Sequence, residues 1–321
     1  MSRVFITGAR GFIGRRLGER LRAGGHEIRG VDVRADPALD VVAGDIAEPG
    51  EWQRHAHGCE TVIHTAAVVS NAVGLREQWR VNVLGTRRAL DAAASAGAAR
   101  FLQLSSVRAF SDRDFPDGVD EAWPVRTDGN PYVDTKVAGE QVALQAHGAG
   151  EVAVTIVRPG DVYGPGSRPW TILPVQEMRA GRLILPAGGR GIFSPVYVDD
   201  LVGGVLRAVE LDAAAGHVFT MTGGIGVTTA EFFGHYARML GRRPPRGLPT
   251  GAVAAIATVA GAVERARGRP SELNASSARY LARRGTYSIA KARRVLGYAP
   301  AIGLEEGMRR TEAWLREQGM L

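Results

Sequence analysis

The sequence predicts an α/β protein built on a doubly wound parallel sheet. Short apolar runs alternate with helical patterns through the first half of the chain, and a glycine-rich turn follows the first run. Repeated β-α-β units of this kind form parallel sheets with right-handed crossovers. At 321 residues the chain can bury a large core without disulfides. We therefore expect an α/β domain with a smaller, mostly helical C-terminal lobe.

Six strands are expected in the first half. Their residues lack a clean polar and apolar alternation, which is typical of strands covered on both faces. The expected strands are 3–7, 27–32, 39–43, 61–65, 100–104 and 152–157. Helical patterns fill the intervals between them, at 12–23, 51–56, 76–96 and 132–147. The α/β domain is therefore expected to span residues 1–160.

The pattern changes after Arg158, where prolines become frequent and segments shorten. A helix at 199–210 and a strand at 217–221 are expected to rejoin the sheet, so 196–222 is assigned to the α/β domain. The lobe then comprises 161–195 and 223–321. Its expected helices are 228–240, 251–267 and 304–318.

Composition limits the classes of protein that this chain can represent. The formal net charge is +7, from 40 Lys and Arg against 33 Asp and Glu, and all but two of the basic residues are Arg. We interpret the arginine pairs as solvated helix faces rather than a nucleic-acid surface, because no nucleic-acid-binding motif accompanies them. The pairs are Arg15-Arg16, Arg87-Arg88, Arg242-Arg243, Arg283-Arg284, Arg293-Arg294 and Arg309-Arg310.

The single cysteine, Cys59, excludes an internal disulfide and favours a cytoplasmic location. The longest apolar stretch, 251–263, has 13 residues, fewer than the roughly 18 to 20 that cross a bilayer. It is interpreted as the wall of an apolar substrate site, a membrane-surface contact or an ordinary packing helix. His55, His57 and Cys59 alternate at a helix end, and no metal site is expected there.

The glycine-rich turn predicts a dinucleotide site. Gly8 permits a sharp turn, Gly11 lets backbone N–H groups approach a pyrophosphate, and Gly14 lets the first helix pack closely on the first strand. Asp32 ends the second strand 18 residues beyond Gly14, where a carboxylate bonds the adenosine ribose. The same carboxylate would repel a 2′-phosphate, so NAD is favoured over NADP, although Arg34 could soften that preference.

A tyrosine and a lysine open the helix expected at 132–147. Their spacing of four places Tyr132 and Lys136 on one face of the helix. A lysine ammonium at this place is expected to lower the tyrosine pKa from about 10. In a chain whose basic residues are otherwise almost all Arg, this Lys indicates a need for a compact ammonium.

With these motifs in place, the chain resembles the extended short-chain dehydrogenase/reductase family, also called the NAD-dependent epimerase/dehydratase family. The resemblance extends over essentially the whole chain, at 7–14, 32, 45–46, 64–67, 82–86, 105–106, 132–136, 158–166 and 198–201. It implies a Rossmann-type domain and a cofactor site. The residues of that site are Gly8, Arg10, Gly11, Phe12, Ile13, Gly14, Asp32, Arg34, Asp45, Ile46, Thr65, Ala66, Ala67, Asn82, Ser105, Tyr132, Lys136, Pro159, Gly160 and Val162.

The resemblance also implies a catalytic set. Ser106 would bond the substrate oxygen, Tyr132 would act as general acid/base, and Lys136 would hold Tyr132 poised. Ser106 is chosen over Ser105 because it stands five residues before Ser111, where relatives place a glycine. The C-terminal lobe would bind the substrate, and a homodimer is expected. The expected substrate pocket contains Val107, Tyr163, Arg168 and Phe193.

Departures from the family pattern narrow the activity. Val107-Arg108 replaces the acidic pair of dehydratases, and Phe193-Ser194 replaces the Arg-Asp of nucleotide-sugar epimerases, although Arg168 and Arg190 could still reach a phosphate. The closing segments resemble those of 3β-hydroxysteroid dehydrogenases and dihydroflavonol reductases. We expect an NAD-dependent oxidoreductase that interconverts a secondary alcohol and a ketone on a bulky, apolar, sterol-like substrate. A nucleotide-sugar 4-epimerase is the alternative, and a catalytically inactive cofactor sensor is disfavoured because Tyr132 and Lys136 are both present.

Overall fold

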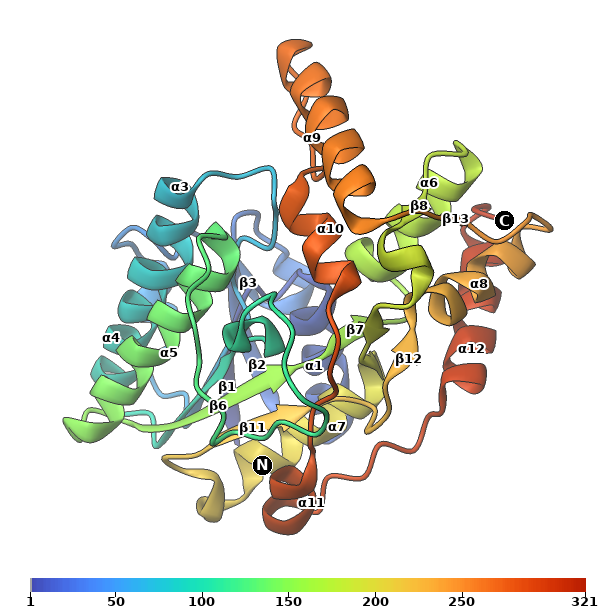
Figure 1. Cartoon of the computed structure of the whole chain (residues 1–321). Coiled ribbons are helices and arrows are strands. Elements are labelled where there is room, and N and C mark those ends of the chain that lie inside the picture. The colour runs from blue at the N-terminus through green and yellow to red at the C-terminus, as the bar shows by residue number, and fades with distance from the viewer. Residues whose placement is uncertain (1) are drawn as a thin grey trace.

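The computed structural model describes residues 2–321, and its centre is a seven-stranded parallel sheet (Figure 1). The strands lie in the order β11-β6-β5-β4-β1-β2-β3. Strands β2 and β3 therefore extend the sheet on one side of β1, and β4 to β6 extend it on the other, so the strand order reverses between β1 and β4. This confirms the predicted fold class. The strands are β1 (Arg3–Thr7), β2 (Glu27–Asp32), β3 (Val41–Ala43), β4 (Thr61–His64), β5 (Arg100–Leu104), β6 (Ala153–Pro159) and β11 (Val218–Met221).

Helices cover both faces of this sheet. One face carries α1 (Phe12–Ala23) and α7 (Val198–Glu210), and the other carries α2 (Trp52–His55), α3 (Leu75–Trp79), α4 (Gly85–Ser95) and α5 (Pro131–Gly148). Side chains of β1 alternate between the two layers, with Val4 and Ile6 in one hydrophobic cluster and Phe5 in the other. Burial on both faces explains why the strand sequences show no clean alternation.

Two elements differ from the sequence-based expectation. The helix expected at 76–96 is divided by a π-helical turn, η2 (Arg80–Leu84), whose extra residue turns Asn82 inward. The strand expected at 39–43 begins only at Val41, because η1 (Pro37–Leu39) is a 3-10 turn and Asp40 takes a left-handed conformation.

The remaining elements lie outside the central sheet. Three short strand pairs join segments far apart in sequence: β7 (Asp161–Tyr163) with β10 (Pro195–Tyr197), β8 (Ile184–Leu185) with β13 (Arg246–Gly247), and β9 (Ile192–Phe193) with β12 (Val227–Thr228). The helices are α6 (Leu173–Arg179), α8 (Thr229–Met239), α9 (Thr250–Ala266), α10 (Ala275–Ala282), α11 (Ala290–Leu296) and α12 (Leu304–Glu317). The pairs and helices α6, α10 and α11 were not predicted as elements, since each is shorter than a clear periodic pattern.

Helix α9 projects from the body of the molecule and packs mainly on α10 (Figure 1). Its outer face is apolar, with Ile256, Val259 and Val263 exposed. Among residues 2–321 the structure has no helix of sufficient length and apolar character to span a bilayer. The boundaries between the α/β domain and the lobe stay a prediction.

Candidate functional site

The glycine turn between β1 and α1 is packed too closely for side chains. Gly8 has a φ of +68°, and a Cβ atom there would lie 2.9 Å from the Ala66 backbone. A Cβ atom at Gly14 would lie 2.9 Å from Thr65 Oγ1 and would overlap the Gly8 carbonyl oxygen. Helix α1 begins after Gly11 without a side-chain cap. The turn therefore presents backbone N–H groups at a helix N-terminus, the arrangement that binds phosphates.

Asp32, at the end of β2, faces this turn. Its Oδ2 accepts a hydrogen bond of 3.0 Å from the Arg10 backbone N–H, which joins the glycine turn to the neighbouring strand. The Arg10 side chain extends toward Asp36, 3.8 Å away, and Arg34 is exposed. The carboxylate thus stands beside the phosphate-binding turn, where an adenosine ribose would lie.

Asp45 follows β3 on the same edge of the sheet. Its Oδ1 accepts from the Ala47 N–H at 2.9 Å, and its Oδ2 accepts from Arg80 Nη1 at 2.8 Å. Ile46 packs against Gly85, where an added Cβ would lie 2.8 Å from the Ile46 side chain. Sequence analysis missed Arg80, because the π-helical turn that aims it at Asp45 has no sequence signature.

A chain of neutral hydrogen bonds lies beneath the strand ends. The Thr86 hydroxyl donates to the Asn82 carbonyl oxygen at 2.8 Å. Because its hydrogen is used there, this hydroxyl accepts from His64 Nε2–H at 3.0 Å. His64 Nδ1 therefore carries no hydrogen, and it accepts from the Thr7 hydroxyl at 2.7 Å. Burial, with a smaller effect from Lys136, lowers the pKa of His64 to about 3. The imidazole is therefore neutral and fixed in one tautomer at physiological pH.

Asn82 connects the loop after β4 to α5. Its Oδ1 accepts from the Val68 N–H at 2.7 Å, and its Nδ2 donates to the Val68 carbonyl and to Thr135. Thr65 Oγ1 donates to the Thr7 carbonyl, and Ala66 N–H donates to the Thr7 hydroxyl. The predicted cofactor residues after β4 are thereby held against β1, at the point where the strand order reverses.

Most of the predicted cofactor residues come together at one edge of the sheet. They follow the carboxyl ends of β1 to β6, and residues 65–67 lie at the reversal of strand order, where doubly wound sheets bind their ligands. Pro159 ends β6, and a Cβ at Gly160 would lie 2.9 Å from Thr222. Val162 is different, because it is buried in the main hydrophobic cluster.

Tyr132 and Lys136 lie in the first turns of α5, which Asn130 caps by accepting from the Tyr132 N–H at 2.9 Å. Only 7% of Tyr132 is exposed. Lys136 Nζ donates to the Leu104 carbonyl at 2.9 Å and lies 5.8 Å from the centre of the Tyr132 ring. The predicted pair therefore sits at the end of β5, on the cofactor edge of the sheet.

The pKa values of this pair differ from the expectation. Burial lowers the pKa of Lys136 to about 8, against an opposing effect of Glu140. Burial raises the pKa of Tyr132, and the largest opposing effect comes from Arg108, followed by a hydrogen bond with Ser106. The expectation that Lys136 lowers the tyrosine pKa is therefore wrong in this structure, because desolvation dominates and Arg108 is the effective cation.

The two neighbouring serines have different partners. Ser105 Oγ donates to the buried carboxylate of Glu140, which also forms a two-point ion pair with Arg158, with Nε to Oε1 at 2.9 Å. Ser106 Oγ instead accepts from the Arg108 N–H at 3.1 Å. The Ser105 hydroxyl is therefore used by a buried ion pair, whereas Ser106 caps the turn that carries Arg108.

Arg108 and Asp112 form a buried ion pair beside Tyr132. Arg108 Nε donates to Asp112 Oδ1 at 2.8 Å, and Nη2 donates to Oδ2. The Arg108 Cζ atom lies 5.2 Å from the centre of the Tyr132 ring and 4.7 Å from that of Tyr280. Sequence analysis recorded Arg108 only as a replacement for an acidic residue, because the pairing with Asp112 depends on the 3-10 turn η3 (Val107–Phe110).

A second buried pair lies on the lobe side. Arg283 is 2% exposed, its Cζ lies 3.8 Å from the centre of the Tyr280 ring, and none of its guanidinium nitrogens makes a hydrogen bond in the described structure. Asp161 lies 3.6 Å from Arg283 and accepts from Tyr280 and from the Ser194 N–H. The interpretation of the Arg283-Arg284 pair as a solvated face is wrong for Arg283, because its guanidinium is buried against the Tyr280 and Tyr287 rings.

Of the four residues expected to form the substrate pocket, Tyr163 and Phe193 lie close together, because both rings pack against Phe232. Val107 belongs to a small cluster with Phe110 and Tyr287. Tyr163 and Phe193 are buried in the main hydrophobic cluster, and Arg168 is exposed. Tyr280 is contacted by three polar residues, Arg108, Asp161 and Arg283, and Arg108 also lies over the Tyr132 ring.

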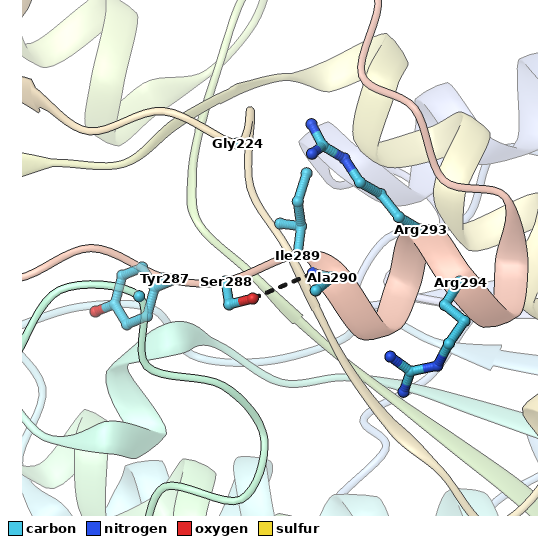
Figure 2. Close-up of a pocket in the computed structure, with 8 residues that line it drawn as sticks. Gly224, Tyr287, Ser288, Ile289, Ala290, Arg293 and Arg294 are labelled. Atoms are coloured by element: carbon cyan, nitrogen blue, oxygen red, sulfur yellow. Dashed lines mark hydrogen bonds between the residues drawn. The ribbon is translucent and has the colours of Figure 1, made fainter.

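A surface pocket of about 600 Å³ opens at the start of α11 (Figure 2). Ser288 Oγ accepts from the Ala290 N–H at its floor, and Arg293 and Arg294 extend from α11. None of the predicted site residues lines this pocket. In the part of the chain that is described, no three His, Cys, Asp or Glu residues are grouped so as to hold a metal ion.

The chain is similar to known proteins over almost its whole length. A 3-beta-hydroxysteroid dehydrogenase of Mycolicibacterium neoaurum is 29% identical, with 96% of this chain and 90% of that protein covered. A 4-hydroxy-2-methyl-3-oxo-4-farnesyl-3,4-dihydroquinoline-1-oxide ketoreductase of Stigmatella aurantiaca is 30% identical, with 95% and 94% covered. Among solved structures, MoeE5 in complex with UDP-glucose and NAD is 25% identical, with a TM-score of 0.79 and 98% and 99% of the two chains covered.

The match to a family model supports this similarity over the whole α/β domain. The model describes the NAD dependent epimerase/dehydratase family, and it matches residues 4–221. This range runs from β1 to the last strand of the central sheet, and it includes the glycine turn, Tyr132 and Lys136. The chain therefore belongs to the NAD-dependent epimerase/dehydratase family and is an enzyme of that family.

Proposed function

We propose that this chain is an NAD-dependent oxidoreductase that interconverts a secondary alcohol and a ketone on a bulky, apolar, sterol-like substrate. The observation that carries this proposal is the position of Tyr132 and Lys136 at the carboxyl end of β5, on the same edge of the sheet as the glycine turn, with Ser106 two residues beyond that strand end. Relatives named as a steroid dehydrogenase and a ketoreductase support the substrate class.

Each residue has a distinct task in the proposed reaction. Ser106 bonds the substrate oxygen, and the Tyr132 phenol gives that oxygen a proton or takes one from it. Lys136 donates one of its three hydrogens to the Leu104 carbonyl, which leaves two for ribose hydroxyls. When bound, NAD supplies hydride transfer at its nicotinamide ring.

The proposed cofactor preference is NAD over NADP. The close packing at Gly8 and Gly14 suits a pyrophosphate, and the Asp32 carboxylate beside the turn would repel a 2′-phosphate. NADH should bind at least about tenfold more tightly than NADPH, and Asp32→Ala should narrow the difference. Fluorescence titration with both reduced cofactors measures this, and equal affinities would overturn the preference.

A substrate panel tests the reaction itself. We expect absorbance at 340 nm to increase when the protein, NAD⁺ and a 3β-hydroxysteroid are mixed, and to decrease with NADH and the matching ketone. A small secondary alcohol such as 2-propanol is the control, because it tests whether turnover requires a bulky, apolar substrate. Turnover of 2-propanol but not of any steroid would place the activity in a different substrate class.

A nucleotide-sugar 4-epimerase is the second candidate, and one observation favours it. The Arg283 guanidinium is buried without hydrogen bonds, a state that a substrate phosphate would relieve. Against this, Phe193 occupies the place of the expected phosphate-binding Arg. Incubation with UDP-glucose and NAD followed by chromatography separates the two proposals: rapid formation of UDP-galactose would put the epimerase first.

The proposal also includes a cytoplasmic location and a homodimer. Cys59 is buried, and burial raises the pKa of its thiol to about 11, so a reactive thiolate is disfavoured.

Sedimentation velocity at several protein concentrations tests the proposed homodimer. A single species with the mass of one chain at all of them would overturn it.

A further inference from the structure

The cation nearest to the Tyr132 ring is Arg108, not Lys136. The Arg108 Cζ atom lies 5.2 Å from the ring centre and Lys136 Nζ lies 5.8 Å from it, with a hydrogen bond directed to the Leu104 carbonyl. We propose that Arg108 is a positioning residue, which holds a permanent positive charge against Tyr132 and so favours the phenolate that proton transfer needs. This inference rests on the proposed function, in which Tyr132 is the general acid/base.

Arg108 is held in place from two sides. Asp112 binds its guanidinium through both carboxylate oxygens, and the Asp112 N–H donates to Asp128 at 2.9 Å. The Tyr280 ring of α10 lies 4.7 Å from the guanidinium carbon. A bidentate pair enclosed by aromatic rings fixes the orientation of the charge, which a flexible surface arginine would not do.

Lys136 is charged over a narrower pH range than Arg108. Burial lowers the pKa of this lysine to about 8, whereas burial raises the pKa of Tyr132 above its usual value near 10. The ammonium therefore loses its proton before the phenol does. An arginine remains charged throughout this range, so Arg108 is the cation that is present when Tyr132 gives up its proton.

The charged groups around Tyr132 act in opposite directions. Arg108 and the Ser106 hydroxyl lower the pKa of Tyr132, and Asp112 raises it. Lys136 extends from α5, as Tyr132 does, and its acidic neighbour is Glu140. Removal of Arg108 and neutralisation of Asp112 should therefore shift the tyrosine pKa in opposite directions. A merely structural role for the ion pair would not produce opposite shifts.

A titration of Tyr132 in the full-length protein tests the inference without any substrate. Tyrosine labelled with ¹³C at Cζ is followed by NMR from pH 7 upward, and Tyr132→Phe assigns the signal. Arg108→Met should raise the Tyr132 pKa by about one unit or more, and Asp112→Asn should lower it. Arg113→Met is the matched control, because Arg113 is exposed and its side chain makes no hydrogen bond in the described structure.

Two further variants keep the test decisive if an unpaired Asp112 prevents folding. Arg108→Met with Asp112→Leu removes both charges, and its tyrosine pKa should lie between those of wild type and Arg108→Met. Arg108→Lys keeps a positive charge but loses the two-point contact with Asp112, so it should restore only part of the wild-type value. An unchanged Tyr132 pKa in Arg108→Met, or in the double variant where the single one does not fold, would overturn the inference. The proposed function would fail separately, through wild-type turnover of Tyr132→Phe.

Discussion

The two sides of the candidate site are held together by different physical means. On the cofactor side, tightly packed glycines and the neutral chain of Thr7, His64 and Thr86 fix the strand ends. On the lobe side, two buried ion pairs, Arg108–Asp112 and Asp161–Arg283, contact Tyr280. Neutral hydrogen bonds stabilise a buried site, whereas buried charges carry a desolvation cost. Tight packing and neutral hydrogen bonds thus hold the glycine turn, whereas the lobe side keeps two charged pairs at the expense of stability.

The largest expected effect concerns His64, on the cofactor side. Its pKa is lowered to about 3 in the folded protein, whereas the unfolded chain binds a proton at this residue below about pH 6.5. Stability is therefore lost as the pH falls from 6.5 toward 3, by up to about 4 kcal/mol. Guanidinium unfolding at pH 6.5 and 4 should show a smaller pH dependence for His64→Gln than for wild type. The exposed His57→Gln is the control, and an equal loss in all three proteins would contradict this assignment.

The next effect concerns the glycine turn. An alanine at Gly14 would press its Cβ on the Gly8 carbonyl and on Thr65, so the turn must move. A displacement of this kind should weaken NADH binding by about 100-fold or more, as seen in fluorescence titration. Gly148→Ala is the matched control, because a Cβ at Gly148 has no neighbour within 4 Å. Wild-type affinity in Gly14→Ala would show that the turn does not hold the cofactor.

Lys136 gives the corresponding effect at alkaline pH. Its pKa is about 8 in the folded protein and about 10.4 in the unfolded chain, so the unfolded state binds more protons between these values. Stability should therefore increase with pH across this window, by about 2 kcal/mol from this residue. Lys136→Met should lack that increase in denaturant unfolding measured at pH 8 and 10. The same increase in variant and wild type would assign it to other groups.

The smallest effect is expected for the pair on the lobe side. Arg283 makes no hydrogen bond in the described structure, and Asp161 keeps Tyr280 and the Ser194 N–H as partners. Replacing the pair together, with Arg283→Met and Asp161→Asn, should change the free energy of unfolding by less than about 1 kcal/mol. A loss of several kcal/mol in thermal or denaturant unfolding would mean that the charges on this side also serve stability.

The contrast between the two sides also explains what the sequence could reveal. The glycine turn, Asp32 and the Tyr132–Lys136 pair have fixed spacings within one element or across one β-α-β unit, so sequence reasoning found them and the sheet around them. Arg283 meets Asp161 across more than a hundred residues, and no local pattern records such a contact. Burial shifts the Tyr132 pKa more than any neighbour does, and burial depends on packing that appears only in the folded chain.

The central claim is that Tyr132 transfers the proton in a redox reaction on the carbinol oxygen. Tyr132→Phe removes the phenolic hydroxyl and keeps the aromatic ring over which the Arg108 guanidinium lies. Turnover of a confirmed substrate, followed at 340 nm, should fall by about 10²- to 10⁴-fold, the usual contribution of a general acid/base, while NADH affinity stays within about twofold. Turnover of Tyr132→Phe at the wild-type rate would contradict the claim, because no proton transfer at this position would then be needed.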